Sequence, residues 1–405
     1  MISVRDAQAH ILAQIGRAVP PEVVPVSAAL GRVLAEDLRA VFDVPPTDNS
    51  AVDGYAVRAA DLPVSGTREL AVVAGVAAGA VFEGAIGPGQ AVRIMTGAPM
   101  PAGADTVYPQ EMVEREGGRV RIPPGARGVN VRHRGEDVRA GTVVLPAGRA
   151  LRPQELGVAA SLGLPQLLVR QKPRVAILST GDEVAEPGDE RKPGQIFDSN
   201  RFSLHGLVEA AGGQATDHGI VPDVYDVLHA KLRAAAATAD MVLTSGGVSV
   251  GDYDLVKAVL QDAGGIDFWQ VAMQPGRPLA VGRIGAAHFF GLPGNPVASM
   301  LTFHLFVRPA LWKLAGRSEL FPPTFHAVAM EPMTKKPGRR ELKRGVLSYA
   351  STAGGGGRWE VRTTGPQGSG ILTSMTLANC FVILEEERGD VAEGGTVSVE
   401  LFSSS

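Results

Sequence analysis

Cysteine is nearly absent from the sequence: Cys380 is the only one among 405 residues. A single thiol excludes an intrachain disulfide, a CxxC redox pair and a cysteine-based zinc cluster. The eight histidines offer no substitute, because none of them stand at metal-ligand spacing. The sequence also lacks a P-loop, an HExxH motif and a Ser, His and Asp set in a known order. These absences argue against a P-loop nucleotidase, a zinc protease of the HExxH type and a serine hydrolase.

Long hydrophobic runs are absent as well. No run reaches 18 apolar residues, and the most apolar helical stretch, 297–312, contains Arg308 and Pro309. The N-terminal stretch carries Arg5 and Asp6 and has no apolar core of a signal peptide. We therefore expect no membrane segment and a cytoplasmic location. A net charge of −3 gives no general attraction to nucleic acid, so an anionic ligand would have to be held by local groups.

Glycine and proline, in contrast, are abundant and spread along the chain, at 50 and 29 residues. This distribution predicts turns between many short strands rather than one disordered tract. The length of 405 residues predicts two to four domains, at roughly 150 residues for each domain.

Two separated segments predict a helical domain that an insertion divides. Apolar residues recur at helical spacing in 2–18, "SAALGRVLAEDLRA" (27–40) continues in a similar style, and 151–164 is helical again. Between them, short β-prone runs alternate with glycine and proline. We expect a discontinuous helical domain, 1–42 plus 138–170, around a β-rich inserted domain, 43–137.

The pattern of predicted strands and helices changes after residue 170. Strand-like runs such as "RVAILST" and "DMVLTS" alternate with helical stretches as far as 318, which predicts an α/β domain (171–318) with a mainly parallel sheet. Asn295 and Pro296 are typical of the N-cap and first position of its last helix. The remaining segment, 319–405, is β-rich and predicts a C-terminal β domain.

Three unusual loops follow strands of the predicted sheet: "STGDE" (179–183), "TSGGVSVGDYD" (244–254) and "GLPGNP" (291–296). Ligands of parallel sheets bind beyond the carboxyl ends of the strands. The small residues allow backbone N–H groups to approach an anion, and nearby helix N-termini favour phosphate. Glu183, Asp252 and Asp254 would repel that phosphate unless a hard cation such as Mg²⁺ lay between them.

Each of these loops is explained equally well by a simpler structure when it is taken alone. A Ser-Gly-Gly sequence is usually an ordinary turn, and "GLPGNP" is compatible with a plain strand-to-helix connection. The shared position of all three at one edge of a sheet favours a binding site. The insertion adds "DNSAVDGYAVR" (48–58), in which Asp53-Gly54 is equally compatible with a hairpin turn. An exposed ion-paired loop accounts for "VRHRGED" (131–137), and a solvated basic run accounts for 335–345.

Eight motifs in order carry a resemblance to a known family: "DNSAVDGYAVR", "RIMTGAPMPAGAD", "RHRGED", "STGDE", "FDSNR", "TSGGVSVGDYD", "GLPGNP" and "TTGPQGS". Together they span essentially the whole chain, and the sequence resembles the molybdopterin molybdenumtransferases. The resemblance implies an elongated subunit of four domains that forms a homodimer, with a central α/β domain like that of molybdopterin adenylyltransferase and a C-terminal domain like a β-barrel. It also implies a reaction in which adenylylated molybdopterin and molybdate give molybdenum cofactor and AMP with Mg²⁺ or a similar divalent ion.

The resemblance also implies roles for individual residues. Glu183, Asp223 and Asp254 would lie on the side of the sheet edge, with Glu183 and Asp254 as metal ligands. Asp53, Thr96 and Asp137 would line a facing wall from the partner subunit. The expected substrate contacts are Ser245, Gly246, Gly247, Ser249, Lys257, Arg277, Pro293, Asn295, Pro296, Arg344 and Ser369.

Two other functions remain alternatives. A scaffold protein of the same fold would bind a partner without catalysis, but it would have no need of the acidic positions. A molybdopterin adenylyltransferase would need neither the β-rich insertion nor the C-terminal domain; as a separate protein, it is a candidate partner that supplies the substrate. Molybdate and tungstate share shape and charge, and the sequence favours neither.

Gln270 and Gln274 stand where many members of the family have lysine, and Arg277 stands where lysine is common. A hydrogen bond from a charged donor contributes roughly 1.5–3 kcal/mol, against about 1 kcal/mol for a neutral one. We therefore predict that the double substitution Gln270→Lys plus Gln274→Lys tightens binding of the nucleotide substrate, measured by titration calorimetry. Unchanged affinity in the double variant would show that the glutamines do not weaken binding.

Overall fold

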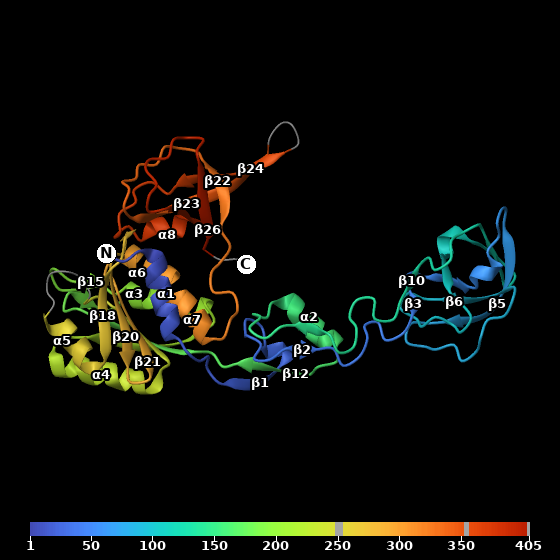
Figure 1. Ribbon diagram of the computed structural model, residues 1–405, viewed down its shortest axis with the longest axis horizontal. Helices are drawn as coiled ribbons and strands as arrows, with labels where there is room; N and C mark the ends of the chain where they lie inside the picture. The colour runs from blue at the N-terminus through green and yellow to red at the C-terminus, as the bar shows by residue number, and fades with distance from the viewer. Residues whose placement is uncertain (248–253, 352–355, 403–405) are drawn as a thin grey trace.

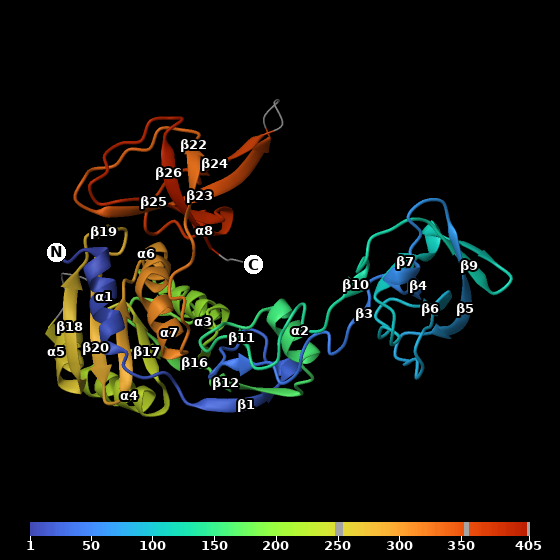
Figure 2. The same ribbon diagram turned by 45° about the vertical axis from the view of Figure 1, so that its right-hand side comes forward.

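The structure, a computed structural model, describes residues 1–247, 254–351 and 356–402. Its parts lie along an extended line (Figures 1 and 2). An α/β domain and a C-terminal β domain stand together at one end, a small unit around helix α2 (Pro153–Ser161) lies next, and a β-rich lobe lies at the far end. Among the described residues, no helix is both long and apolar enough to cross a membrane.

A six-stranded, mainly parallel sheet forms the α/β domain, which confirms the predicted fold class. Its strands in spatial order are β16 (Gln214–Val221), β13 (Arg174–Thr180), β17 (Met241–Ser245), β21 (Ala287–Leu292), β20 (Pro278–Ile284) and β18 (Gly265–Gln270). The first four strands run parallel, and β20 pairs antiparallel with both β21 and β18. Almost every residue of β13, β17 and β21 is buried, because helices cover both faces of the sheet.

Two layers of helices provide that cover. One face packs against α4 (Tyr225–Thr238) and α5 (Asp254–Ala263) through a core that includes Leu228, Leu232 and Val259. The other face packs against α3 (Asn200–Ala210), α6 (Pro296–Thr302) and α7 (Arg308–Leu314). A π-helical turn, Phe303–Val307, joins α6 to α7. The predicted start of α6, with Asn295 as N-cap and Pro296 first in the helix, is confirmed.

The first helix, α1 (Val4–Gln14), belongs to this second layer. Its buried residues Val4, Ala7 and Ile11 join the core of the α/β domain. The sequence placed this segment in the discontinuous helical domain, and the structure differs because the apolar face of α1 is covered by the π-turn and α7 instead. Helical periodicity indicates that a face is buried, but not which neighbour buries it.

The small unit combines segments from both sides of the insertion in one core that includes Leu34, Leu38, Leu151 and Leu162. Its strands are β1 (Pro21–Pro25) with β12 (Gln166–Arg170), and β2 (Leu38–Arg39) with β11 (Val143–Leu145). The predicted helix over 27–40 is wrong: only a short turn, Val26–Ala28, is helical. Backbone bonds from this segment to Arg149, Leu151 and Leu168 hold it extended, so tertiary pairing overrides its helical periodicity.

The β-rich lobe contains one six-stranded sheet. Its spatial order is β7 (Thr106–Pro109), β4 (Gly54–Val57), β6 (Gln90–Ile94), β5 (Arg68–Val76), β9 (Arg119–Ile122) and β8 (Glu114–Glu116). The lobe is entered through β3 (Asn49–Ser50) and left through β10 (Val131–Arg132), and these two strands pair with each other.

The C-terminal domain is a closed barrel, which confirms the barrel-like prediction. The ring of strands is β23 (Arg340–Ser351), β24 (Gly357–Thr363), β22 (Phe325–Ala329), β26 (Thr396–Leu401) and β25 (Cys380–Leu384), which pairs again with β23. A short strand of the α/β domain, β19 (Met273–Gln274), extends this sheet, and helix α8 (Thr373–Leu377) lies at the junction. The exact domain boundaries drawn from the sequence stay predictions.

The packing of α1 predicts which part of the molecule Ile11→Ala destabilises. Truncation of a buried isoleucine removes roughly 2–5 kcal/mol. We expect faster amide hydrogen exchange in α6 and α7, and unchanged exchange in the small unit, measured by mass spectrometry. Leu162→Ala is the matched control, with the reverse pattern expected. Faster exchange of the small unit in Ile11→Ala would contradict the observed packing.

Candidate functional site

A cavity of about 370 Å³ opens at the carboxyl edge of the parallel strands, where β13 and β17 end and α3 and α6 begin. The lining residues are Ser179, Thr180, Glu183, Val184, Ile196, Phe197, Asp198, Ser199, Asn200, Ser245, Gly246, Gly294, Asn295, Pro296, Gly370 and Leu372. The structure therefore brings together all three loops that the sequence singled out. Five of the predicted site residues, Glu183, Ser245, Gly246, Asn295 and Pro296, line this one cavity.

Glycine is required at the rim of this cavity because the ends of two strands approach closely. Gly246 has φ +91°, and a Cβ atom there would lie 2.6 Å from the carbonyl oxygen of Thr180. Gly181 has φ +128°, and a Cβ atom there would lie 2.3 Å from Glu183 Oε2. The sequence predicted that backbone N–H groups of this loop face an anion, but the Gly246 N–H donates to the carbonyl of Leu292 at 3.1 Å. The missing side chain of Gly246 makes room for the Thr180 carbonyl instead.

Three buried polar atoms at the cavity have no hydrogen-bond partner within the described residues: Ser179 Oγ, Thr180 Oγ1 and Asn200 Oδ1. Asn200 Nδ2 donates to Ser245 Oγ and to the carbonyl of Gly294, each at 2.7 Å. Buried polar groups are nearly always paired, so a cluster of unpaired ones indicates a place that a polar ligand or water completes. The sequence reasoning missed these residues as site residues, although the motifs "STGDE" and "FDSNR" contain them.

Negative charge gathers beside the cavity at Asp182, Glu183 and Asp223. Asp223 lies at the surface at the end of β16, and its N–H is 3.5 Å from Asp182 Oδ1. Partial burial of its carboxyl group, followed by the charges of Asp182 and Glu183, raises the pKa of Asp223. No three His, Cys, Asp or Glu side chains converge on a possible metal position in the part of the chain described. Asp252 and the side chain of Asp254 lie outside that part.

A second group of predicted residues lies in the β-rich lobe. Asp53 Oδ1 accepts hydrogen bonds from Thr96 Oγ1 at 2.6 Å and from Thr96 N at 2.8 Å. The Thr96 hydroxyl, followed by its N–H, lowers the pKa of Asp53, so this carboxylate stays ionised. The alternative of a hairpin turn at Asp53-Gly54 is wrong. Gly54 begins β4 with an ordinary φ, and it is glycine because a Cβ atom would lie 1.9 Å from the Tyr108 carbonyl oxygen.

Asp137 lies in another hollow of the same lobe, about 510 Å³ in volume, with Val44, Pro45, Asn49, Arg132 and Glu136. The ion-paired explanation of this loop holds for its neighbours, since His133 contacts Asp48 and Arg134 contacts Asp43. Asp137 itself has no ion pair among the described residues.

Within one chain these two groups of residues do not meet. Figure 1 shows β3, β4, β6 and β10 in a lobe that the small unit separates from the sheet edge of the α/β domain, and Figure 2 shows the same separation. Asp53, Thr96 and Asp137 are therefore remote from Glu183 and Asp223 of the same molecule.

The C-terminal domain contributes a buried cation next to the cavity. Arg344 is fully buried, and its Nε and Nη2 donate to Ser374 Oγ and the Gly368 carbonyl, each at 3.0 Å. Nη1 has no partner among the described residues, and burial lowers the pKa of the guanidinium. The Ser369 carbonyl accepts from Val297 N at 3.0 Å, so the loop that rests on Arg344 also contacts the first turn of α6.

The remaining predicted contacts do not line the cavity. Arg277 Nη2 lies 3.4 Å from Gln270 Oε1 at the antiparallel edge of the sheet, and Gln274 faces a different hollow with Lys336 and Arg339. Pro293 is buried behind the cavity, and Gly247, with φ +70°, follows Gly246 out of β17. Ser249 and the side chain of Lys257 lie outside the described residues.

Comparisons with known proteins give one consistent result over the full length. Family models match for the MoeA N-terminal region (domains I and II) at residues 2–163, a probable molybdopterin binding domain at 176–313 and the MoeA C-terminal region (domain IV) at 326–402. The chain is 40% identical over 406 residues to the molybdopterin molybdenumtransferase of Haemophilus influenzae, covering 100% of this chain and 99% of that one. It is 37% identical to molybdopterin molybdenumtransferase 2 of Mycobacterium tuberculosis, covering 98% of this chain and 99% of that one.

Solved structures agree with the sequence relatives. The molybdopterin biosynthesis MoeA protein of Pyrococcus horikoshii superposes with a TM-score of 0.86 at 34% sequence identity. The alignment covers 99% of this chain and 100% of that one. A second structure of the protein from that organism gives a TM-score of 0.79 at 32% identity, with both chains covered completely.

The raised pKa of Asp223 predicts that Asp223→Asn stabilises the fold at pH 7, by no more than about 1 kcal/mol because the group is exposed. A carboxyl group whose pKa is higher in the folded state lowers stability as pH rises through that pKa. The gain should therefore shrink when thermal unfolding is repeated near pH 4. Asp226→Asn is the control, since it removes the same charge from the first turn of α4, where negative charge is favourable. An equal gain in both variants would contradict the explanation.

Proposed function

The chain belongs to the molybdopterin molybdenumtransferase family, and from this premise we propose that it transfers molybdenum from molybdate into adenylylated molybdopterin and releases AMP. The observation that supports this reaction at this site is the sheet-edge cavity. It is of a size typical for small-molecule sites, it lies where parallel sheets bind ligands, and it holds buried polar atoms that no described residue satisfies.

A divalent cation fits the residues beside that cavity. Asp182, Glu183 and Asp223 carry three negative charges with no ion-pair partner among the described residues, and the raised pKa of Asp223 reflects its partial burial and then the charges of the other two. We propose that Glu183 and Asp254 hold Mg²⁺ or a similar hard ion, with Asp223 near it. When bound, such an ion neutralises charge on the diphosphate of the substrate. The acidic side chains by themselves would repel that diphosphate.

Arg344 supplies a further reason to expect an anionic substrate at this junction. A buried guanidinium is normally matched by a carboxylate, but Arg344 contacts a hydroxyl and a carbonyl and keeps Nη1 unpaired. Planar N–H donors suit tetrahedral oxyanions such as molybdate or a phosphate group. We propose that Arg344 and the Ser369 loop bind the oxyanion substrate beside the pterin nucleotide.

The remote wall of the β-rich lobe supports a homodimeric site. Thr96 holds Asp53 ionised, and Asp53 forms no salt bridge among the described residues. We propose that the protein is a homodimer in which the lobe of one protomer, with Asp53, Thr96 and Asp137, faces the sheet-edge cavity of its partner. We also propose that it acts in the cytoplasm. A separate molybdopterin adenylyltransferase is the proposed donor of the substrate. A scaffold of the same fold would need none of these ionised side chains.

Mixing two inactive variants tests the reaction and the shared site together. We expect Asp53→Ala and Glu183→Ala each to lose about 100-fold or more in molybdate-dependent AMP release, with unchanged circular dichroism. After subunit exchange, half of the dimers are mixed and each has one intact site, so roughly a quarter of the wild-type activity should return.

The control for this experiment mixes Asp53→Ala with Thr96→Ala. Both substitutions damage the same wall, so no mixed dimer contains an intact site and activity should stay absent. Failure of the Asp53 and Glu183 pair to recover would contradict a site shared between subunits. Full activity of Asp53→Ala alone would remove this aspartate from the mechanism.

A further inference from the structure

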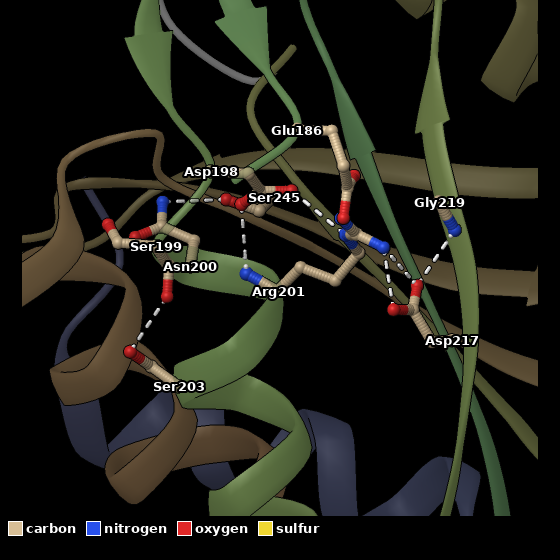
Figure 3. A network of polar contacts seen from close by, with 9 residues as sticks. All are labelled: Glu186, Asp198, Ser199, Asn200, Arg201, Ser203, Asp217, Gly219 and Ser245. Atoms are coloured by element: carbon tan, nitrogen blue, oxygen red, sulfur yellow. Dashed lines mark hydrogen bonds and ion pairs between the residues drawn. The ribbon is translucent and has the colours of Figure 1, made fainter. Parts of the chain in front are cut away.

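Arg201 is a buried cation at the centre of an ion cluster next to the cavity (Figure 3). It lies in the first turn of α3, and its side chain is 4% exposed. Nε donates to Asp198 Oδ2 at 3.0 Å, Nη1 donates to both carboxylate oxygens of Asp217 at 2.6 Å, and Nη2 donates to Glu186. One guanidinium therefore uses all of its nitrogens on three carboxylates.

These carboxylates come from three different segments. Glu186 follows β14 (Val184–Ala185), Asp198 follows β15 (Ile196–Phe197), and Asp217 lies within β16. Asp198 also accepts the Arg201 N–H at 3.1 Å, and Asp217 accepts the Gly219 N–H at 2.8 Å. Arg201 thus ties the segment that carries Glu183 to the first turn of α3 and to the outer strand of the sheet.

Asn200, the residue before Arg201, has a different set of partners. Asn200 reaches Ser245 at the end of β17 and the Gly294 carbonyl before α6, and its Oδ1 is one of the unpaired atoms of the cavity. Since Asn200 and Arg201 are consecutive in one helical turn, the carboxylate cluster determines where the Asn200 amide lies. Figure 3 shows the Asn200 side chain joined to Ser245 and the Arg201 side chain joined to the three carboxylates.

Charge balance alone does not explain the geometry of this cluster. Glu186 and Asp217 keep 42% and 41% of their side-chain surface exposed, so water would solvate both without Arg201. The three carboxylates outweigh the desolvation of the buried guanidinium and raise the pKa of Arg201. The planar guanidinium donates to the three carboxylates in fixed directions, and this fixes the position of the first turn of α3. The compact ammonium group of a lysine would not do so.

We propose that Arg201 is a positioning residue: it holds Asn200 and the segment 183–186 in the geometry that binds the substrate, without touching the substrate itself. The inference rests on the proposed function for its choice of substrate, and on the geometry alone for the positioning. It assigns Asn200 Oδ1 as an acceptor for a hydrogen-bond donor of the bound pterin nucleotide.

Arg201→Lys tests the proposal, because it keeps the charge and loses the fork. We expect KM for adenylyl-molybdopterin to rise about tenfold or more, with kcat within about twofold of the wild type. Amide exchange should become faster in 183–202 and stay unchanged in α6 and α7. Arg174→Lys is the control away from the cavity, since Arg174 is 55% exposed and pairs with one carboxylate, Asp240, at the opposite end of β13, with Nη2 3.0 Å from Oδ1. It should change neither quantity.

The two measurements separate the possible failures. Unchanged KM and exchange in Arg201→Lys would overturn the positioning role. A fall in kcat and thermal stability at constant KM would also overturn it, because that pattern belongs to a purely structural ion cluster. If the wild type shows no turnover, the proposed function fails. The exchange data then decide the positioning role alone: faster exchange confined to 183–202 supports it, and no change overturns it.

Discussion

The close approach of strand ends at the carboxyl edge of the α/β sheet is the constraint on which the rest of the site depends. A Cβ atom at Gly246 would meet the Thr180 carbonyl oxygen, and Gly181 has φ +128°, which residues with a side chain rarely adopt, so the chain turns away from the sheet there without side chains. That turn opens the cavity, and the hydroxyls of Ser179 and Thr180 are buried there with no hydrogen-bond partner in the described part of the chain. The helices α3 and α6 then begin at its rim, and Asn200, the first residue of α3, donates to Ser245 and to the Gly294 carbonyl before α6.

Much of this edge could be predicted from the sequence, because strand and helix alternation determines where loops of a parallel sheet gather. The three loops follow from that alternation, and the family resemblance implies site roles within them for Glu183, Ser245, Gly246, Asn295 and Pro296, which line one cavity. Asn200 and Arg201 were not named, because their importance depends on Ser245, Gly294 and Asp217, which are distant in the sequence. Only the folded chain makes those neighbours visible.

The predictions that the structure contradicts fail because of long-range contacts as well. The segment 27–40 has helical periodicity, but bonds to Arg149 and Leu151 hold it extended. Asp53-Gly54 has the composition of a hairpin turn, but the approach of Tyr108 explains the glycine and Thr96 explains the aspartate. In both cases a long-range contact decides what a local pattern leaves open. Long-range contacts also explain why α1 packs on the α/β domain.

The proposed function is tested most directly by the reaction at the sheet-edge cavity itself. Purified protein, adenylyl-molybdopterin, Mg²⁺ and molybdate should be mixed, and AMP followed by chromatography. We expect one AMP released for each molybdenum cofactor formed, with no release when molybdate or the divalent ion is omitted. AMP release that ignores molybdate, or substrate that stays intact in the complete mixture, would contradict the account.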